Sequence, residues 1–332
     1  MSVNATKDQL GSDQRTIVTV TLNPSVDRTV EIAHLIRGEV TRATGSHVHP
    51  GGKGVNVTRA LLANQISSVA LLPAGGAEGR RLVDLLDHDG VRHVAVPVTG
   101  ETRSNITIAE ADGTTTKLNA PGESMSEAEL DAVAAQVLAL AWPGDWVVLC
   151  GSLPPGVDED IYARSCRALR AAGMRVAVDT SGPALTASLA GTPDLIKPNA
   201  EELAAAVGRD LPTLGDAIEA AKELRASGVG TVVISLGGAG AVLVDEVGVL
   251  AGSSHAADVR SSVGAGDCFL AGYLGAVDSG RENALLHALA YGAAAVQLPG
   301  SQVPGPTEVD LSAARLFDAD ELARSLGMPT AR

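Results

Sequence analysis

Short aliphatic runs alternate with helical patterns from about residue 125 onward. Near-continuous Val, Ile and Leu predict strands that are covered on both faces, at 146–150, 175–179, 194–197 and 231–236. Helices are expected between them, at 126–141, 157–173 and 213–228. The first begins with a Ser126–Glu129 capping box, and Gly173 and Gly228 stand where helix ends favour a left-handed residue. This order predicts an α/β fold with a mainly parallel sheet and helices on both sides.

The first third of the chain has a different pattern. Residues 16–22 and 68–72 again resemble core strands, whereas 28–35, 39–48 and 102–121 alternate polar and apolar residues, as half-exposed strands do. Asp112-Gly113 between two such runs is a hairpin signal. We therefore expect a small sheet that stands off the main body, inserted at about 28–48 and 102–121. Residues 1–15 are polar and lack the apolar region of a signal peptide, so a flexible N-terminal tail is expected there.

Composition excludes several classes of protein. Apolar residues make up 45% of the 332 residues, which allows a sizeable core, and aromatics only 2%, so the core is expected to be aliphatic. The 39 acidic residues outnumber 25 scattered basic ones, so nucleic acid and anionic membranes are not expected partners. No apolar run reaches the roughly 18 residues of a membrane span. Three cysteines without metal-ligand or CxxC spacing are expected to be core thiols in a reducing cytoplasm.

The stretch SSVGAGD at 261–267 precedes an apolar helical pattern. Glycines before a helix leave backbone N–H groups free at its N-terminus, where the helix dipole favours an anion such as phosphate. Asp267 then falls in the first turn, beside the bound anion, where a carboxylate can take the proton of an attacking hydroxyl. The same position suits a plain helix cap, and this alternative stays open.

Two further loops follow predicted strands. In KPNAEEL (197–203), Lys, Asn and Glu can address phosphates and the waters of Mg²⁺, although Asn199 and Glu202 also suit a capping box. In SLGGAG (235–240), Ser and three glycines allow backbone close to phosphate, although a hairpin loop would look the same. Neither GxxxxGK[ST] nor GxGxxG occurs, so a Walker A loop and a dinucleotide enzyme are disfavoured.

Other candidate side chains lie nearer the N-terminus. Asp27 in LNPSVD can accept hydrogen bonds from sugar hydroxyls, Lys53 and Asn56 in GGKGVN suit a polar or phosphorylated sugar, and Arg103 in TRSN can clamp a phosphate. Ser152 in GSLPPG is a further donor. Each of these is by itself equally compatible with a solvated loop. Together they converge on the edge formed by the carboxyl ends of several predicted strands.

The motifs LNPSVD, GGKGVN, GSLPPG, DTSG, KPNAEE, SLGGAG and SVGAGD, in this order, resemble those of the ribokinase-like carbohydrate kinases of the PfkB family. The resemblance runs from about Thr16 to about Gln302. The lysine of GGKG, the TRSN segment and KPNAEEL are most similar to the bacterial 1-phosphofructokinase subgroup. The resemblance implies a ribokinase-like three-layer α/β/α core in a single kinase domain over 16–326. It also implies a β-sheet lid that joins two subunits as a homodimer.

The same resemblance implies a function. The subgroup phosphorylates D-fructose 1-phosphate with ATP and Mg²⁺, giving fructose 1,6-bisphosphate. Tagatose 6-phosphate and fructose 6-phosphate remain alternative substrates, because the sequence does not separate these isomers. A non-catalytic sugar-phosphate sensor is the alternative of a different class, and the intact GAGD motif argues against it.

The motif match also assigns roles to residues. Asp267 becomes the catalytic base, with an anion hole made by Gly264, Ala265 and Gly266. The sugar phosphate is expected against Asp27, Gly51, Gly52, Lys53, Asn56, Arg103, Asn105 and Ser152. The ATP side is expected to comprise Lys197, Asn199, Glu202, Ser235, Gly237, Gly238 and Gly240, with Glu202 reaching Mg²⁺ through water. Cys268 replaces the family's usual Ser, Ala or Thr after the base, which suggests sensitivity to thiol reagents.

Overall fold

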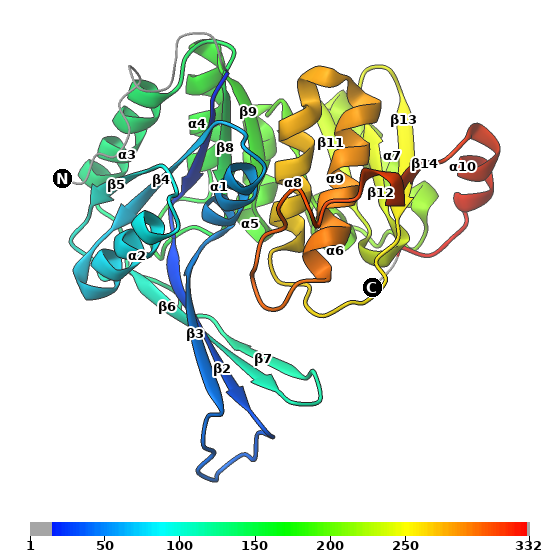
Figure 1. The fold of residues 1–332 in the computed structure, drawn as a ribbon. Helices are drawn as coiled ribbons and strands as arrows, with labels where there is room; N and C mark the ends of the chain where they lie inside the picture. Colours follow the sequence, from blue (N-terminus) through cyan, green and yellow to red (C-terminus); the bar gives the residue numbers. More distant parts are fainter. Residues whose placement is uncertain (1–14, 331–332) are drawn as a thin grey trace.

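The computed structural model describes residues 15–330, and its strands form two separate sheets (Figure 1). The tail expected at 1–15 lies outside the described residues, except for Arg15. Within the described part of the chain, no helix combines the length and the apolar character that a membrane span requires.

The large sheet contains the strands predicted as aliphatic runs, together with a C-terminal extension. Its order is β14-β13-β12-β11-β10-β9-β8-β1-β4-β5. Pairing is parallel from β5 to β11 and antiparallel from β11 to β14. The strands are β1 (Ile17–Thr21), β4 (Ser68–Ala74), β5 (His93–Pro97), β8 (Trp146–Cys150), β9 (Arg175–Asp179), β10 (Leu195–Ile196), β11 (Thr231–Ser235), β12 (Ala241–Val244), β13 (Val249–Ser254) and β14 (Ala314–Leu316). The prediction of a mainly parallel sheet is confirmed.

Helices cover both faces of this sheet, which gives the three layers expected from the sequence. Alternate strand residues pack to opposite sides: Val147 faces one hydrophobic cluster and Val148 the other, because side chains in a strand point alternately to its two faces. One face is covered by α3 (Glu127–Leu140), α4 (Ile161–Ala171), α5 (Gly182–Ser188), α6 (Ala200–Val207), α7 (Leu214–Ala226) and the short α10 (Ala319–Ser325). The other is covered by α1 (Lys53–Ala63), α2 (Gly76–His88), α8 (Ala265–Ala276) and α9 (Arg281–Val296).

The small sheet projects from the large one, as Figure 1 shows. Its order is β3-β2-β6-β7, with β2 and β6 parallel and the outer pairs antiparallel. The strands are β2 (Ser25–Ile32), β3 (Gly45–Gly51), β6 (Arg103–Glu110) and β7 (Thr115–Leu118). We call this sheet the lid sheet. The hairpin expected at Asp112-Gly113 joins β6 to β7.

Two expected strand boundaries were wrong. The strand expected at 28–35 begins already at Ser25 and ends at Ile32, and that expected at 39–48 forms only from Gly45 to Gly51. Residues 33–44 form an exposed connection, closed where the Thr44 N–H donates to the Glu31 carbonyl at 2.8 Å. Alternating polarity alone could not distinguish this connection from a solvated strand. The Ser126–Glu129 capping box is formed and Gly173 and Gly228 have φ of 86° and 111°, as expected, but the helix expected from residue 157 begins at Ile161.

Candidate active site

A cavity of about 790 Å³ lies beside the carboxyl ends of β10 and β11 and the N-terminus of α8. Many of the residues singled out in the sequence line it, although they come from loops far apart in the chain. They are Lys53, Lys197, Asn199, Glu202, Ser235, Gly237, Gly238, Gly240, Gly264, Ala265, Gly266 and Asp267. Further wall residues that the sequence did not single out individually include Ser254, His255, Val259, Ala293 and Val296.

The N-terminus of α8 supplies an anion-binding geometry to this cavity. Gly264 is the N-cap, with a left-handed φ of 77° that favours glycine. The first N–H groups of any helix lack partners within the helix: Gly266 carries such a group here, whereas the Ala265 N–H makes a long hydrogen bond, 3.4 Å, to the Ser262 carbonyl. A side chain at Gly266 would lie 3.4 Å from Lys197 Nζ, so this ammonium group is close to the start of the helix. N–H groups and a cation together favour a phosphate at this point.

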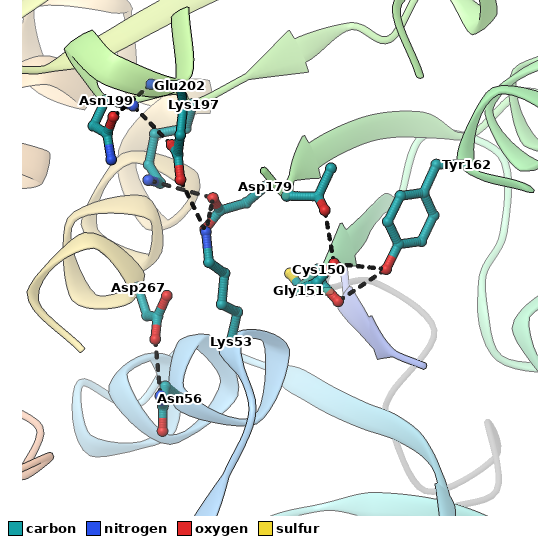
Figure 2. Close-up of polar contacts among 11 residues, drawn as sticks. Lys53, Asn56, Cys150, Gly151, Tyr162, Asp179, Lys197, Asn199, Glu202 and Asp267 are labelled. Carbon is teal, nitrogen blue, oxygen red and sulfur yellow. Dashed lines mark hydrogen bonds and ion pairs between the residues drawn. The ribbon is translucent and has the colours of Figure 1, made fainter. Parts of the chain in front are cut away.

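Asp267 lies in the first turn of α8 and is buried. The Asn56 Nδ2 amide donates to its Oδ2 at 2.8 Å, which joins α8 to α1 (Figure 2). Burial, followed by the nearby Asp179 carboxylate, raises the pKa of Asp267 to about 6, although Lys53, Asn56 and Lys197 oppose this shift. A carboxylate with a pKa near neutrality is well matched to proton abstraction at physiological pH.

Asp179 is the centre of a charge cluster beneath the cavity. Its Oδ1 lies 2.9 Å from Lys53 Nζ and 3.4 Å from Lys197 Nζ (Figure 2). Burial raises the pKa of this carboxyl, but the two ammonium groups outweigh burial and hold the pKa below its ordinary value. Burial lowers the pKa of Lys53, and the carboxylates of Asp179, Asp267 and Glu202 raise it overall. No role was predicted for Asp179, although the DTSG motif ends a buried strand, and that position was the available signal.

The Lys53 side chain contacts a carboxylate that the sequence did not single out. The prediction put its ammonium group against the sugar phosphate, beside Asp27 and Arg103. The structure instead directs it to Asp179 and, at 3.9 Å, to Glu202 Oε1, on the side of the residues expected to bind ATP. Its side chain is 32% exposed, so it remains accessible from the cavity.

Asn199 and Glu202 cap a helix and also line the cavity. They form a complete capping box at the start of α6, with Glu202 N–H donating to Asn199 Oδ1 at 2.8 Å and Asn199 N–H to Glu202 Oε2 at 2.9 Å. Both also line the cavity. The cap therefore fixes side chains that face the cavity, rather than competing with a binding role.

A second cluster gathers at the base of the lid sheet. Asp27 Oδ1 accepts hydrogen bonds from Ser25 Oγ at 2.7 Å and from Asn105 Nδ2 at 2.9 Å. Gly51, on the neighbouring strand, is so close to the Asp27 carboxylate that an added Cβ would overlap it. Gly52 has φ of 114°, and a Cβ there would meet Thr21. These glycines let the end of β3 pass close to Asp27 on β2 and let the start of α1 pass close to Thr21 at the end of β1.

Arg103 and Ser152 belong to the same region but differ from the expectation in detail. The Arg103 guanidinium donates from Nε and Nη2 to the Asn23 carbonyl and from Nη1 to the Ala120 carbonyl, at 2.9–3.2 Å. Three of the guanidinium nitrogens therefore donate to backbone carbonyls of neighbouring loops instead of facing a ligand. Asn23 Nδ2 donates to the Pro121 carbonyl and approaches Ser152 Oγ at 3.5 Å. Asn23 is a buried polar residue of this cluster that the sequence reading missed.

The structure argues against a reactive Cys268. The residue is 1% exposed, and burial together with the Asp267 carboxylate raises the pKa of its thiol to about 12. Because the thiolate is the reactive form, reagents in solution are not expected to modify it in the folded protein. Cys150 and Cys166 are also buried and free, as expected of core thiols.

Comparison with known proteins agrees with this geometry. The family model described as pfkB family carbohydrate kinase matches residues 20–308. The chain is 41% identical over 303 residues to the 1-phosphofructokinase of Rhodobacter capsulatus, covering 87% of this chain and 93% of that protein. Other proteins of that name, from Vibrio cholerae, Xanthomonas campestris, Bacillus subtilis and Haemophilus influenzae, are 34–39% identical.

Solved structures show the same fold. Phosphofructokinase-2 from Escherichia coli, in complex with substrates and products, superposes with a TM-score of 0.84 at 34% identity, covering 89% of this chain and 97% of that one. Arabidopsis thaliana ribokinase, complexed with ribose and ATP, superposes with a TM-score of 0.72 at 25% identity over the same shares of the two chains. The expected ribokinase-like fold is thereby confirmed.

We predict that Gly51→Ala lowers the free energy of unfolding by about 1–3 kcal/mol, the usual cost of an overpacked site. The new methyl group would displace the Asp27 carboxylate from its bonds with Ser25 and Asn105. Gly238→Ala is the matched control, because an added Cβ there meets no atom within 4 Å and its φ is not left-handed. Denaturant unfolding measures both variants, and equal stabilities would contradict the packing argument.

Proposed function

The chain belongs to the pfkB family of carbohydrate kinases, and we propose that within this family it transfers the γ-phosphoryl group of ATP to D-fructose 1-phosphate. The products are fructose 1,6-bisphosphate and ADP. The observation that carries the proposal is the position of Asp267, buried at the start of α8 between the large cavity and Asn56. The substrate is argued from the relatives named 1-phosphofructokinase, several of which cover more than three quarters of the chain.

In the mechanism that we propose, ATP occupies the large cavity. Its adenine would pack among the small and apolar wall residues of α9, such as Ala293 and Val296, and its phosphates would face the α8 N-terminus. The N–H groups of Ala265 and Gly266, with the Lys197 ammonium, would stabilise the charge that develops on the transferring phosphoryl oxygens.

Asp267 acts as the general base in this scheme. Its carboxylate takes the proton of the attacking sugar hydroxyl as the bond from the sugar oxygen to the γ-phosphorus forms. The bond from the γ-phosphorus to the bridging oxygen breaks, and ADP leaves with that oxygen. Asn56 Oδ1 is buried and makes no hydrogen bond among the described residues, so it can accept one from a hydroxyl of the bound sugar.

The sugar phosphate is proposed to bind between Asn56 and the base of the lid sheet. Asp27, held by Ser25 and Asn105, presents a carboxylate for sugar hydroxyls. Arg103 would contribute mainly by fixing the Asn23 and Ala120 carbonyls, with its remaining N–H groups left for the phosphate. Gly51, Gly52 and Ser152 shape the approach to this cluster.

The cavity also fits Mg²⁺ that arrives with ATP. Glu202 supplies a carboxylate that is 17% exposed and lines the cavity, next to Asn199. Among residues 15–330 no group of three His, Cys, Asp or Glu side chains could hold a metal, which agrees with an ion bound mainly by phosphate and water. When bound, Mg²⁺ neutralises phosphate charge, and Glu202 is proposed to reach it through water.

A second candidate substrate is fructose 6-phosphate. Phosphofructokinase-2 from E. coli has been solved in complex with fructose-6-phosphate, and that structure superposes on this chain with a TM-score of 0.82. The two substrates exchange the ends of the sugar: fructose 1-phosphate would react through its C6 hydroxyl and fructose 6-phosphate through its C1 hydroxyl. Tagatose 6-phosphate stays an alternative that none of the relatives named above favours.

We predict a large preference for fructose 1-phosphate when kcat/KM is compared for the three sugar phosphates. Release of ADP with MgATP, measured in a coupled assay at equal low substrate concentration, gives this comparison. A preference for either 6-phosphate would keep the base and the mechanism but refute the proposed substrate. Binding without ADP release for all three would favour a sugar-phosphate sensor.

We predict that Asp267→Asn lowers kcat about 10²–10⁴-fold, the usual contribution of a general base.

In the unsubstituted protein kcat/KM should fall as the pH drops through about 6, because protonated Asp267 cannot accept a proton. Sugar phosphates titrate in the same range, with a second pKa of about 6, so variants must be compared on one substrate. The acidic limb of the pH profile is the range in which kcat/KM falls as the pH drops. Asn56→Ala should move this limb to higher pH, because it removes a hydrogen bond that lowers the Asp267 pKa. Near-normal turnover by Asp267→Asn would refute its role.

The lid sheet is proposed to join two copies of the chain, and the kinase is proposed to work in the cytoplasm. Ile106 and Leu118, paired across β6 and β7, are 38% and 54% exposed, and a second copy of the lid sheet would cover this apolar pair. Sedimentation should show a dimer that Leu118→Glu weakens. Val247→Glu is the control, because Val247 is an equally apolar, 72% exposed residue outside the lid. A monomeric protein would refute this assembly.

A further inference from the structure

We propose that Asp179 is a positioning residue for phosphoryl transfer, which holds the ammonium groups of Lys53 and Lys197 side by side where the large cavity meets Asp267. This inference rests on the proposed function, since it concerns the same site. It deepens that function by explaining why two cations remain in place next to the reacting phosphate. None of the roles expected from the sequence included this carboxylate.

The first argument is geometric. One oxygen of Asp179, Oδ1, contacts both ammonium groups, at 2.9 Å and 3.4 Å. These lysines come from α1 and from the end of β10, so the carboxylate joins two separate parts of the chain (Figure 2). Lys53 and Lys197 both line the cavity, whereas Asp179 is not one of its lining residues. Asp179 therefore acts on the cavity through the two lysines and not by direct contact.

The second argument is electrostatic. Asp179 is 1% exposed, and its Oδ2 has no hydrogen-bond partner among the described residues. A desolvated carboxylate is costly unless it is paired, so the lysines are what keep it ionised. Conversely, two ammonium groups this close would repel each other without the anion between them. Lysine side chains are flexible, and their position before phosphate arrives must come from such a contact.

The third argument is the effect of the Asp179 charge on the proposed base, Asp267. The Lys53 ammonium contacts Asp179, and both charges act on Asp267: the Asp179 carboxylate raises the pKa of Asp267, whereas Lys53 lowers it. The charged and titratable groups around the pair are Lys53 from α1, Lys197 after β10, Glu202 from α6, Cys150 from β8, Tyr162 from α4 and Cys268 from α8. The two thiols and the Tyr162 phenol stay neutral, because burial raises the pKa of each above its ordinary value. Removal of the Asp179 charge should therefore lower the Asp267 pKa.

Asp179→Asn tests the proposal, because it keeps the size of the side chain and removes its charge. We expect kcat to fall about 10- to 100-fold, as misplaced catalytic groups do. The acidic limb of kcat/KM should move to lower pH. The Kd of MgATP, measured by calorimetry, should be unchanged or lower, because an anion beside the phosphate site has gone. Normal kcat, or an unmoved acidic limb, would overturn the proposal.

Tyr162→Phe is the matched control. Its hydroxyl donates to the carbonyls of Cys150 and Gly151 at 3.1 Å, in the same buried cluster, and carries no charge. We expect this variant to lose stability without moving the acidic limb. Asp179→Asn could instead lower kcat, ATP affinity and melting temperature together and leave the acidic limb of the pH profile unmoved. In that case the role of Asp179 would be structural and the proposal would be wrong.

A double variant covers the case in which Asp179→Asn fails to fold. Asp179→Asn combined with Lys53→Met removes one charge of each sign, and it is compared with Lys53→Met alone. If Asp179 acts through Lys53, adding Asp179→Asn to Lys53→Met should lower kcat little further. Losses in kcat that add up from the two substitutions would overturn the proposal. If the unsubstituted protein phosphorylates no sugar phosphate, the proposed function fails. Weaker MgATP binding by either Asp179→Asn variant than by its parent would then separately refute the role of Asp179.

Discussion

The parallel direction of the strands from β5 to β11 is the constraint on which the site depends. Parallel strands place all their carboxyl ends at one edge, and the loops that follow them meet there. Asp179, Lys197 and Ser235 each lie at or just after the end of a strand in this run. The start of α8 arrives at the same edge from the C-terminal half. Residues more than 200 positions apart, such as Asn56 and Asp267, thereby form a hydrogen bond.

The buried charges at this edge are stable only as a group. A lone carboxylate with the burial of Asp179 would favour its neutral form, and two unpaired lysines would be mobile. In the cluster, each charge is compensated and each side chain is fixed. Asp267 is the exception, because burial and a neighbouring anion raise its pKa to about 6. The cluster therefore stabilises its two cations, while Asp267, the base that we propose, keeps a pKa suited to the proposed phosphoryl transfer.

Several local features serve both folding and chemistry. The Asn199–Glu202 pair caps α6 and lines the cavity, so the capping alternative is confirmed and leaves the proposed binding role possible at the same position. The glycines of GGKGVN allow close passage against Asp27 and Thr21, instead of only exposing backbone to a ligand. The Arg103 guanidinium donates hydrogen bonds to the backbone carbonyls of Asn23 and Ala120. A motif therefore identifies a position in the site more reliably than it identifies what each side chain contacts.

The layered α/β fold, the aliphatic strands, the helix caps and the loops around the cavity could be predicted from the sequence. These features depend on local periodicity, on turn and cap chemistry, and on an ordered set of motifs. The direction of the Lys53 side chain, the place of Asp179 between two lysines and the burial of Cys268 became apparent only in the folded protein. Those facts depend on distances between segments that are remote in the chain and on exclusion from water. Neither quantity is encoded in the pattern of any one segment.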